Sequence, residues 1–321
     1  MTASESTGDP TPSLVSKLVG GDRGALARAI TMVENETDAA PGIFRGVRPH
    51  LGRAFVVGVT GAPGTGKSTL VSAYAAELRQ RELSVGIVAV DPSSPITGGA
   101  LLGDRIRMHV HSEDQAVFIR SIASRGHVGG LSKTAARVID LMDAAGKDVV
   151  IVETVGIGQS EIEIAEIADT KVVVCAPGLG DDVQAMKAGV LEIADILVVN
   201  KADLPFADRT MTELATMIEL SSRDWKPPVL RTVATTGEGV SELADAISEH
   251  GARAGSTREA KARWRVQRLI ANLAAQTIAE DLMTSDDPRL AELCDGVLRG
   301  DVALEAAAAK AITSLPLRRM E

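Results

Sequence analysis

The stretch of sequence that decides the fold is an eight-residue pattern, Gly61-Ala62-Pro63-Gly64-Thr65-Gly66-Lys67-Ser68. It matches GxxxxGK(S/T), in which glycines let the backbone turn its N–H groups inward around phosphate oxygens. A β-rich run at residues 54–60 precedes the pattern and a helical stretch at 67–81 follows it, which is the context that such a loop requires. The stretch therefore predicts a nucleoside triphosphate site between a strand and a helix.

The phosphate loop, residues 61–68, assigns expected roles to its side chains. The helix after the loop directs its positive end at the phosphates. Lys67 is expected to contact the β- and γ-phosphates, and the Ser68 hydroxyl to coordinate Mg²⁺. The residues expected to bind nucleotide in this stretch are Gly61, Ala62, Pro63, Gly64, Thr65, Gly66, Lys67, Ser68 and Thr69.

Outward from the loop, short runs rich in Val and Ile alternate with helical stretches. Nearly continuous Val and Ile runs that are separated by helices predict a parallel sheet covered on both faces. The expected strands are residues 54–60, 84–90, 116–119, 148–152, 171–175, 196–200 and 229–233. Helices between them are expected at residues 67–81, 133–145 and 182–193. The predicted fold class is therefore α/β, with a doubly wound, mostly parallel sheet.

A second motif, Asn200-Lys201-Ala202-Asp203, predicts which base is bound. The pattern NKxD places the Asp203 carboxylate to accept hydrogen bonds from guanine N1–H and the exocyclic amine, a donor pair that adenine lacks. The Lys201 stem can pack along the base. Asp203 can also be an N-cap of a helix, and that alternative stays open. The loop behind the base is expected after the last apolar run, at Val233, Ala234 and Thr235.

Acidic residues follow several predicted strands, at the edge where a doubly wound sheet places its ligand chemistry. Asp91 ends the run at residues 84–90, and Asp104 lies in the next segment. Either can hold Mg²⁺ directly or through water, or orient the attacking water. Glu153 and Gly156 stand where other GTPases carry DxxG, with the acid near Mg²⁺ and the glycine N–H at the γ-phosphate. For each acid, the alternative is a capping or turn carboxylate.

These assignments give two expected sets of residues. The catalytic set is Lys67, Asp91, Asp104, Glu153 and Gly156. The expected Mg²⁺ ligands are Ser68, Asp91, Asp104 and Glu153.

Four segments are expected along the chain. Residues 1–13 are rich in Ser, Thr, Pro and acids, which predicts a disordered tail. Residues 14–50 are expected to be helical, with a break at Gly20 and Gly21. Residues 51–255 are expected to form the nucleotide-binding domain, and residues 256–321 a helical extension. Helices in that extension are expected at residues 261–283, 288–299 and 302–313.

The helical extension is too short to bury its own apolar faces, because three helices over about 65 residues need another surface to pack against. A homodimer is therefore expected, with the extension as the dimerisation element. The side chains expected to be left unburied are Trp264, Val266, Leu269, Ile270, Leu273 and Ile278.

Composition excludes several classes of protein. The 321 residues carry 34 Lys and Arg against 43 Asp and Glu, a formal charge of −9, which argues against nucleic acid as a partner. No apolar run approaches the roughly 18 residues that a membrane-spanning helix needs, so no membrane partner is expected. The two cysteines, Cys175 and Cys294, can supply no disulfide framework and fit a reducing cytoplasm. The composition predicts a soluble cytoplasmic protein.

Together the motifs resemble the methylmalonyl-CoA mutase-associated GTPases, the MeaB/ArgK/MMAA family, which belongs to the SIMIBI class of P-loop GTPases. The resemblance covers the chain from about residue 14 to the C terminus. Besides the two nucleotide motifs it rests on residues 91–95, 99–108, 118–121, 124–126 and 153–161.

The resemblance implies an enzyme with slow intrinsic, Mg²⁺-dependent GTP hydrolysis to GDP, which acts as chaperone of an adenosylcobalamin-dependent acyl-CoA mutase. Such a chaperone gates cofactor loading from an adenosyltransferase and protects the mutase, whether the mutase acts on methylmalonyl-CoA or isobutyryl-CoA. Residues 177–189 resemble the loop through which the family communicates with its mutase, so Asp182 and Lys187 are candidates for coupling. The alternative is a solvated helix face. Gln159 is the local candidate to help position the attacking water.

Three other readings stay open. A nickel-insertion GTPase shares both nucleotide motifs but carries metal-binding Cys and His residues, whereas Cys175 and Cys294 are expected to be core residues. The pair His109 and His111 is expected to lie in a surface turn. A small-molecule kinase or transport ATPase is disfavoured by the guanine motif. A scaffold with structural nucleotide is disfavoured by the set Lys67, Ser68, Asp91 and Glu153.

Overall fold

The computed structural model describes residues 11–92, 111, 113–124, 130–154, 167–178, 193–220, 225–253 and 258–314. The chain divides into two compact units, Met1–Arg265 and Val266–Glu321.

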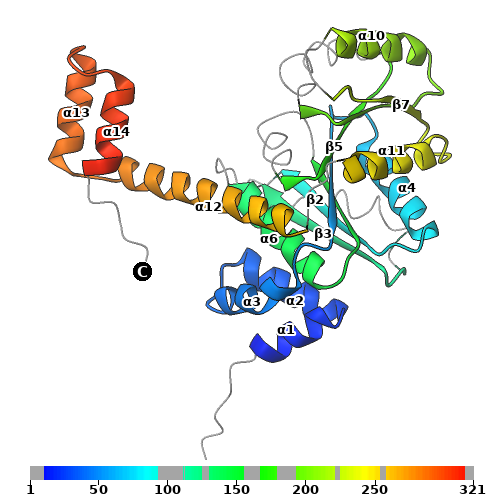
Figure 1. Ribbon diagram of the computed structural model, residues 1–321, viewed down its shortest axis with the longest axis horizontal. Helices are drawn as coiled ribbons and strands as arrows, with labels where there is room; N and C mark the ends of the chain where they lie inside the picture. The colour runs from blue at the N-terminus through cyan, green and yellow to red at the C-terminus, as the bar shows by residue number, and fades with distance from the viewer. Residues whose placement is uncertain are drawn as a thin grey trace, which may run out of the picture. The chain divides into compact units, whose positions relative to one another are not determined.

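The first unit is built on a seven-stranded sheet in which every strand pairing is parallel (Figure 1). The strand order is β3-β2-β4-β1-β5-β6-β7. The strands are β1 (Phe55–Thr60), β2 (Val85–Pro92), β3 (Val117–Ser124), β4 (Val149–Thr154), β5 (Thr170–Cys175), β6 (Ile196–Asn200) and β7 (Val229–Thr232). All seven expected strands are confirmed, and the doubly wound α/β class with them.

Alternate residues of the central strands face two different cores, as strand geometry requires. In β5, Val172 and Val174 pack against α4 (Lys67–Gln80) and α11 (Val240–Arg253), in one continuous apolar cluster. Val173 and Cys175 face the other way, into a cluster with Leu214 of α10 (Ala207–Glu219). The sheet is therefore covered on both faces, which explains why its strands read as unbroken Val and Ile runs.

Helix α6 (Gly130–Ala144) covers the second face of the sheet over β2 and β3, the last two strands on one side. A Cβ on Gly86 would lie 2.6 Å from Met142 Sδ of α6, so this glycine lets β2 and α6 approach closely. The helix expected at residues 133–145 is confirmed. The helix expected at 182–193 lies almost wholly outside the described residues.

Helices α1 (Thr11–Val19), α2 (Arg23–Glu34) and α3 (Ala40–Val47) precede the sheet, followed by a short 3-10 turn (Arg48–His50). Helix α1 begins at Thr11, three residues earlier than expected. The predicted break is confirmed: Gly21 adopts a φ of +83°, and Asp22 caps α2 by accepting a hydrogen bond from Ala25 N at 2.6 Å. All three helices contact α6.

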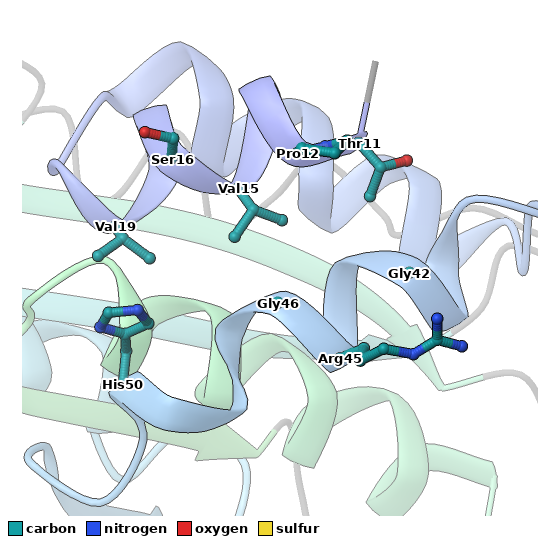
Figure 2. Close-up of a pocket in the computed structure, with 9 residues that line it drawn as sticks. All are labelled: Thr11, Pro12, Val15, Ser16, Val19, Gly42, Arg45, Gly46 and His50. Carbon is teal, nitrogen blue, oxygen red and sulfur yellow. The ribbon is translucent and has the colours of Figure 1, made fainter. Parts of the chain in front are cut away.

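A groove of about 630 Å³ lies where α1 crosses α3 (Figure 2). Val15 of α1 stands over Gly46 of α3, and Val19 stands over His50. A Cβ on Gly46 would come within 2.9 Å of the Val15 side chain, so the small residue sets how closely the two helices pack. The groove shares no residue with the phosphate loop.

The second unit holds most of α12 (Arg258–Met283), with α13 (Pro288–Leu298) and α14 (Leu304–Ser314). These bounds agree with the three helices expected in the extension. Val266 and Ile270 are 39% and 63% exposed, as the apolar pattern of the extension predicts. Cys294 of α13 is also exposed, so its expected core position is wrong. The buried residue of α13 is Gly296, two positions further on.

Within the described residues, no helix has both the length and the apolarity to cross a membrane.

Candidate nucleotide site

The phosphate loop connects β1 to α4 at the edge of the sheet where the parallel strands end. Two of its glycines hold conformations and contacts that no other residue can adopt. Gly61 has a φ of +144°, and a Cβ there would stand 2.1 Å from Val174 O of β5. Gly66 has a φ of +89°, and a Cβ there would stand 2.5 Å from Asn200 Nδ2. The glycine pattern is therefore required by the neighbouring strands as well as by the loop.

Lys67 is the first residue of α4, and its ammonium folds back over the loop. The Nζ atom donates to Gly61 O at 2.7 Å and Ala62 O at 3.0 Å, and the residue is only 7% exposed. A second ammonium, that of Lys201, donates to Gly64 O at 2.8 Å. Two cations and the N-terminus of a helix thus meet at one loop, an arrangement that favours a polyanion.

Ser68 and Glu153 form a buried pair beside Lys67. The Ser68 hydroxyl donates to Glu153 Oε1 at 2.6 Å, and the two residues are 8% and 1% exposed. A hydroxyl and a carboxylate are oxygen donors of the type that Mg²⁺ prefers. The pair therefore fits the ion that the sequence assigns to it, with Ser68 from α4 and Glu153 from the end of β4.

Asn200, the last residue of β6, joins three loops through one side-chain amide. Its Nδ2 donates to Thr65 O of the phosphate loop at 2.9 Å. Its Oδ1 accepts from Thr232 Oγ1 at 3.1 Å and from Ala234 N at 3.2 Å. The guanine motif is thus bound both to the phosphate loop and to the loop at residues 233–235.

The other residues of the guanine motif follow in a tight turn. Lys201 adopts a φ of +57°, and Ala202 N donates to Thr232 O at 3.0 Å. Asp203 is exposed. Of the loop expected behind the base, Val233 and Ala234 are buried and Thr235 is exposed. The strand ends thus bring the two predicted nucleotide motifs together.

Several candidate residues cannot be placed. Asp104, Gly156, Gln159, Asp182 and Lys187 lie outside the described residues. Asp91 belongs to β2 and pairs with Ala123 of β3, but only its backbone is described. The residue before it, Val90, pairs with Thr154, the last residue of β4, so the backbone of Asp91 lies one residue past the end of β4.

His111 contradicts the expected surface turn. The residue is 6% exposed, and its Nε2 lies 2.9 Å from Ser72 O and 3.1 Å from Ser72 Oγ on α4. The segment after it is also fixed: Arg79 Nε donates to Asp114 Oδ2 at 2.9 Å, and this guanidinium lowers the pKa of the Asp114 carboxyl. His111 is therefore a packing residue against the phosphate-loop helix. In the part of the chain that the structure describes, no three His, Cys, Asp or Glu residues form a metal cluster.

Three buried threonines at this edge were not predicted as part of the site. Thr154 Oγ1 donates to Thr60 Oγ1 at 3.0 Å, where β4 and β1 end. Thr232 likewise orients Asn200. In the sequence, each of these residues is only a threonine at the end of an apolar run. Such a threonine does not show which side chain it hydrogen-bonds, and the partner of Thr60 lies 94 residues away.

Known proteins similar to this chain over most of its length also indicate a nucleotide-binding protein of the P-loop type. A family model described as methylmalonyl Co-A mutase-associated GTPase MeaB matches residues 26–287. A relative from Pyrococcus horikoshii is 48% identical over 289 residues, which cover 87% of this chain and 91% of the relative. GTPase ArgK of Escherichia coli is 39% identical over 243 residues, 73% of each protein. A crystal structure titled LAO/AO transport system kinase matches with a TM-score of 0.75 at 27% identity, over 96% of this chain and 98% of that one.

Proposed function

The chain belongs to the family of methylmalonyl Co-A mutase-associated GTPases, and from this premise we propose that it is the GTP-driven chaperone of a cobalamin-dependent acyl-CoA mutase. The chain is a GTPase of the P-loop fold, with GTP and GDP as its ligands. The observation that supports the proposal most directly is the family match over residues 26–287, which spans both nucleotide motifs. In this proposal the chaperone gates loading of the cobalamin cofactor from an adenosyltransferase and protects the mutase.

The proposed mechanism begins with charge. The Lys67 ammonium lies 2.7 Å from Gly61 O inside the phosphate loop, where it offsets the charge that builds up on the β- and γ-phosphates. Asn200 fixes the loop against the guanine motif, so base binding and phosphate binding use one rigid frame. Asp203 accepts hydrogen bonds from the guanine edge.

Mg²⁺ is the second part of the mechanism. Ser68 and Glu153 would hold the ion, with Asp91 and Asp104 as further candidates from the neighbouring segments. When bound, Mg²⁺ neutralises charge on the phosphate oxygens and orients them for in-line attack. Gly156 is proposed to meet the γ-phosphate and Gln159 to help position the water. No arginine is present in the phosphate loop, so we propose that hydrolysis is slow until a partner orders the switch segments.

Replacing Glu153 by glutamine tests the Mg²⁺ role. The amide keeps the shape of the side chain but loses the negative charge, so we expect GTP turnover to fall about 10- to 100-fold and the Mg²⁺ concentration for half-maximal rate to rise. Asp195→Asn is the matched control, because Asp195 is also buried but lies at the opposite ends of the strands, next to Lys171. An unchanged Mg²⁺ requirement in Glu153→Gln would remove Glu153 from the metal site.

The chaperone role is tested by GTP turnover with and without purified methylmalonyl-CoA mutase. We expect the mutase to raise the rate at least about tenfold, since a partner that orders switch segments supplies the missing transition-state contacts. Lys187→Ala should keep the basal rate and lose most of the stimulation. Absence of stimulation by every cobalamin-dependent acyl-CoA mutase of the same source would overturn the chaperone role and leave the GTPase intact.

A separate measurement on the full chain tests whether the protein is a homodimer. Exposed Val266 and Ile270 on α12 supply apolar surface for a second copy of the chain, and we propose that the helical extension, residues 256–321, forms the contact. Light scattering on the full chain should give twice the monomer mass of 33.5 kDa. Neither Cys175 nor Cys294 takes part in a disulfide, which fits a reducing compartment, and we propose the cytoplasm.

A further inference from the structure

The ends of β1 and β4 are joined by a hydrogen bond between two threonine side chains. Thr154 Oγ1 donates to Thr60 Oγ1 at 3.0 Å, and the residues are 0% and 3% exposed. The paired register of the two strands runs as far as Val59 opposite Glu153. The threonines stand one step further along, at the points where the phosphate loop leaves β1 and where the chain leaves β4.

The threonine bond and the Ser68–Glu153 bond act on opposite faces of β4. Val149 and Ile151 belong to the core cluster that includes α4, and Glu153 continues their row toward Ser68 of α4. Thr154 is the next residue and therefore points to the other face. One strand end is thus held from both faces by consecutive side chains, which fixes its rotation about its own axis as well as its position.

We infer that the Thr60–Thr154 hydrogen bond is a positioning clamp for GTP hydrolysis, which sets the separation of the Ser68 hydroxyl and the Glu153 carboxylate at the phosphate loop. The inference rests on the Mg²⁺ role of that pair in the proposed function and does not depend on the mutase. Thr60 and Thr154 touch neither nucleotide nor ion in this scheme. They act through the loop and the strand end that they join.

The expected displacement of the strand ends can be estimated from the distances at which hydroxyl and methyl groups pack. Two hydroxyl oxygens approach to 3.0 Å in this bond, whereas two methyl carbons pack at about 3.5–4.0 Å. Valine at both positions would therefore move the strand ends apart by about 0.5–1 Å. A displacement of about 1 Å at a catalytic site can cost about 100-fold in rate.

The test compares Thr60→Val, Thr154→Val and the double variant. Each single variant leaves one buried hydroxyl without its partner, so we expect its melting temperature to drop by about 3 °C. The double variant removes both hydroxyls and should regain most of that loss. Its kcat for GTP should nevertheless stay about 10- to 100-fold low, with a raised Mg²⁺ requirement and a KM for GTP within about threefold of wild type.

Two further variants complete the design. Thr154→Ser keeps the hydroxyl and should restore kcat to near the wild-type value. Thr170→Val is the matched control, because Thr170 is a fully buried threonine bonded to His250 Nδ1 at 2.8 Å, at the start of β5 and thus at the opposite ends of the strands. We expect Thr170→Val to lower the melting temperature and to leave the Mg²⁺ requirement unchanged.

The clamp is overturned if the double variant hydrolyses GTP with wild-type kcat and Mg²⁺ requirement. It is also overturned if kcat merely follows melting temperature through the whole set, Thr170→Val included. All of these assays use the full chain without mutase, so failure of the chaperone proposal leaves their result untouched. Loss of the Mg²⁺ role would instead show in Glu153→Gln, whose requirement for the ion would then equal that of wild type.

Discussion

Lys67→Ala should lower GTP turnover by about 10²- to 10³-fold, the largest loss of turnover expected from a single substitution in this chain. The ammonium is buried in the phosphate loop within hydrogen-bond distance of two of its carbonyls, so it is already in place before the phosphates bind. An alanine removes the positive charge that stabilises the transferring phosphoryl group, and Lys201, the second ammonium at the loop, donates to a different carbonyl, Gly64 O. Single-turnover hydrolysis of GTP measures the loss directly.

Lys147→Ala is the matched control for Lys67→Ala. Lys147 also donates to a main-chain carbonyl, Ala116 O at 2.9 Å, and burial lowers the pKa of its ammonium. It lies at the opposite ends of the strands, before β4 begins, so its loss should affect melting temperature and leave turnover close to wild type. Turnover in Lys67→Ala within threefold of this control would show that the ammonium has no catalytic role.

Asp203→Asn should weaken GTP binding by about 10²- to 10⁴-fold and improve binding of xanthosine triphosphate. Two charge-assisted hydrogen bonds to guanine are lost, each worth about 1.5–3 kcal/mol. The new amide donates to the extra carbonyl of xanthine instead. Titration of a fluorescent guanine and a fluorescent xanthine nucleotide measures both changes in one experiment.

Asp208→Asn is the control for Asp203→Asn, because Asp208 is another exposed aspartate five residues further on, in the first turn of α10. It should leave both affinities unchanged. ATP should bind the wild-type chain far more weakly than GTP, since adenine leaves the Asp203 carboxylate without its donors. Equal affinity for ATP and GTP, or phosphoryl transfer to a small-molecule acceptor, would favour the kinase reading that stayed open.

The sheet could be predicted from the sequence because its signal is local. A strand that is buried on both faces must be apolar at successive positions, and residues 149–152 of β4, 172–175 of β5 and 196–199 of β6 satisfy this without interruption. The prediction for β3 stopped at residue 119, but the strand continues to Ser124. Arg120 broke the apolar pattern, and its charge is accommodated by an ion pair with Glu34 of α2. A contact 86 residues away in the sequence thus made a charged residue acceptable in a strand.

The candidate site was predictable where a motif carries the chemistry and unpredictable where tertiary contacts support it. The phosphate loop and the guanine motif could be read from residue types at fixed spacing. The bonds that hold them cannot be read in this way: Thr232 orients Asn200, and His111 packs on Ser72. The first contact depends on which strand ends meet, and the second on how the segment before β3 packs against α4, so both depend on the tertiary structure.

The bond between Asn200 Nδ2 and Thr65 O also has a consequence for protein synthesis. Its two residues are 135 positions apart, and β1 becomes an inner strand only when β4 and β5 flank it. At about 5–20 residues per second, a ribosome adds the second half of the nucleotide site about 7–27 s after the first. During that interval the nascent chain carries the complete phosphate-loop sequence without the neighbours that shape it. The contact between the guanine motif and the phosphate loop therefore forms only after β6 has been added.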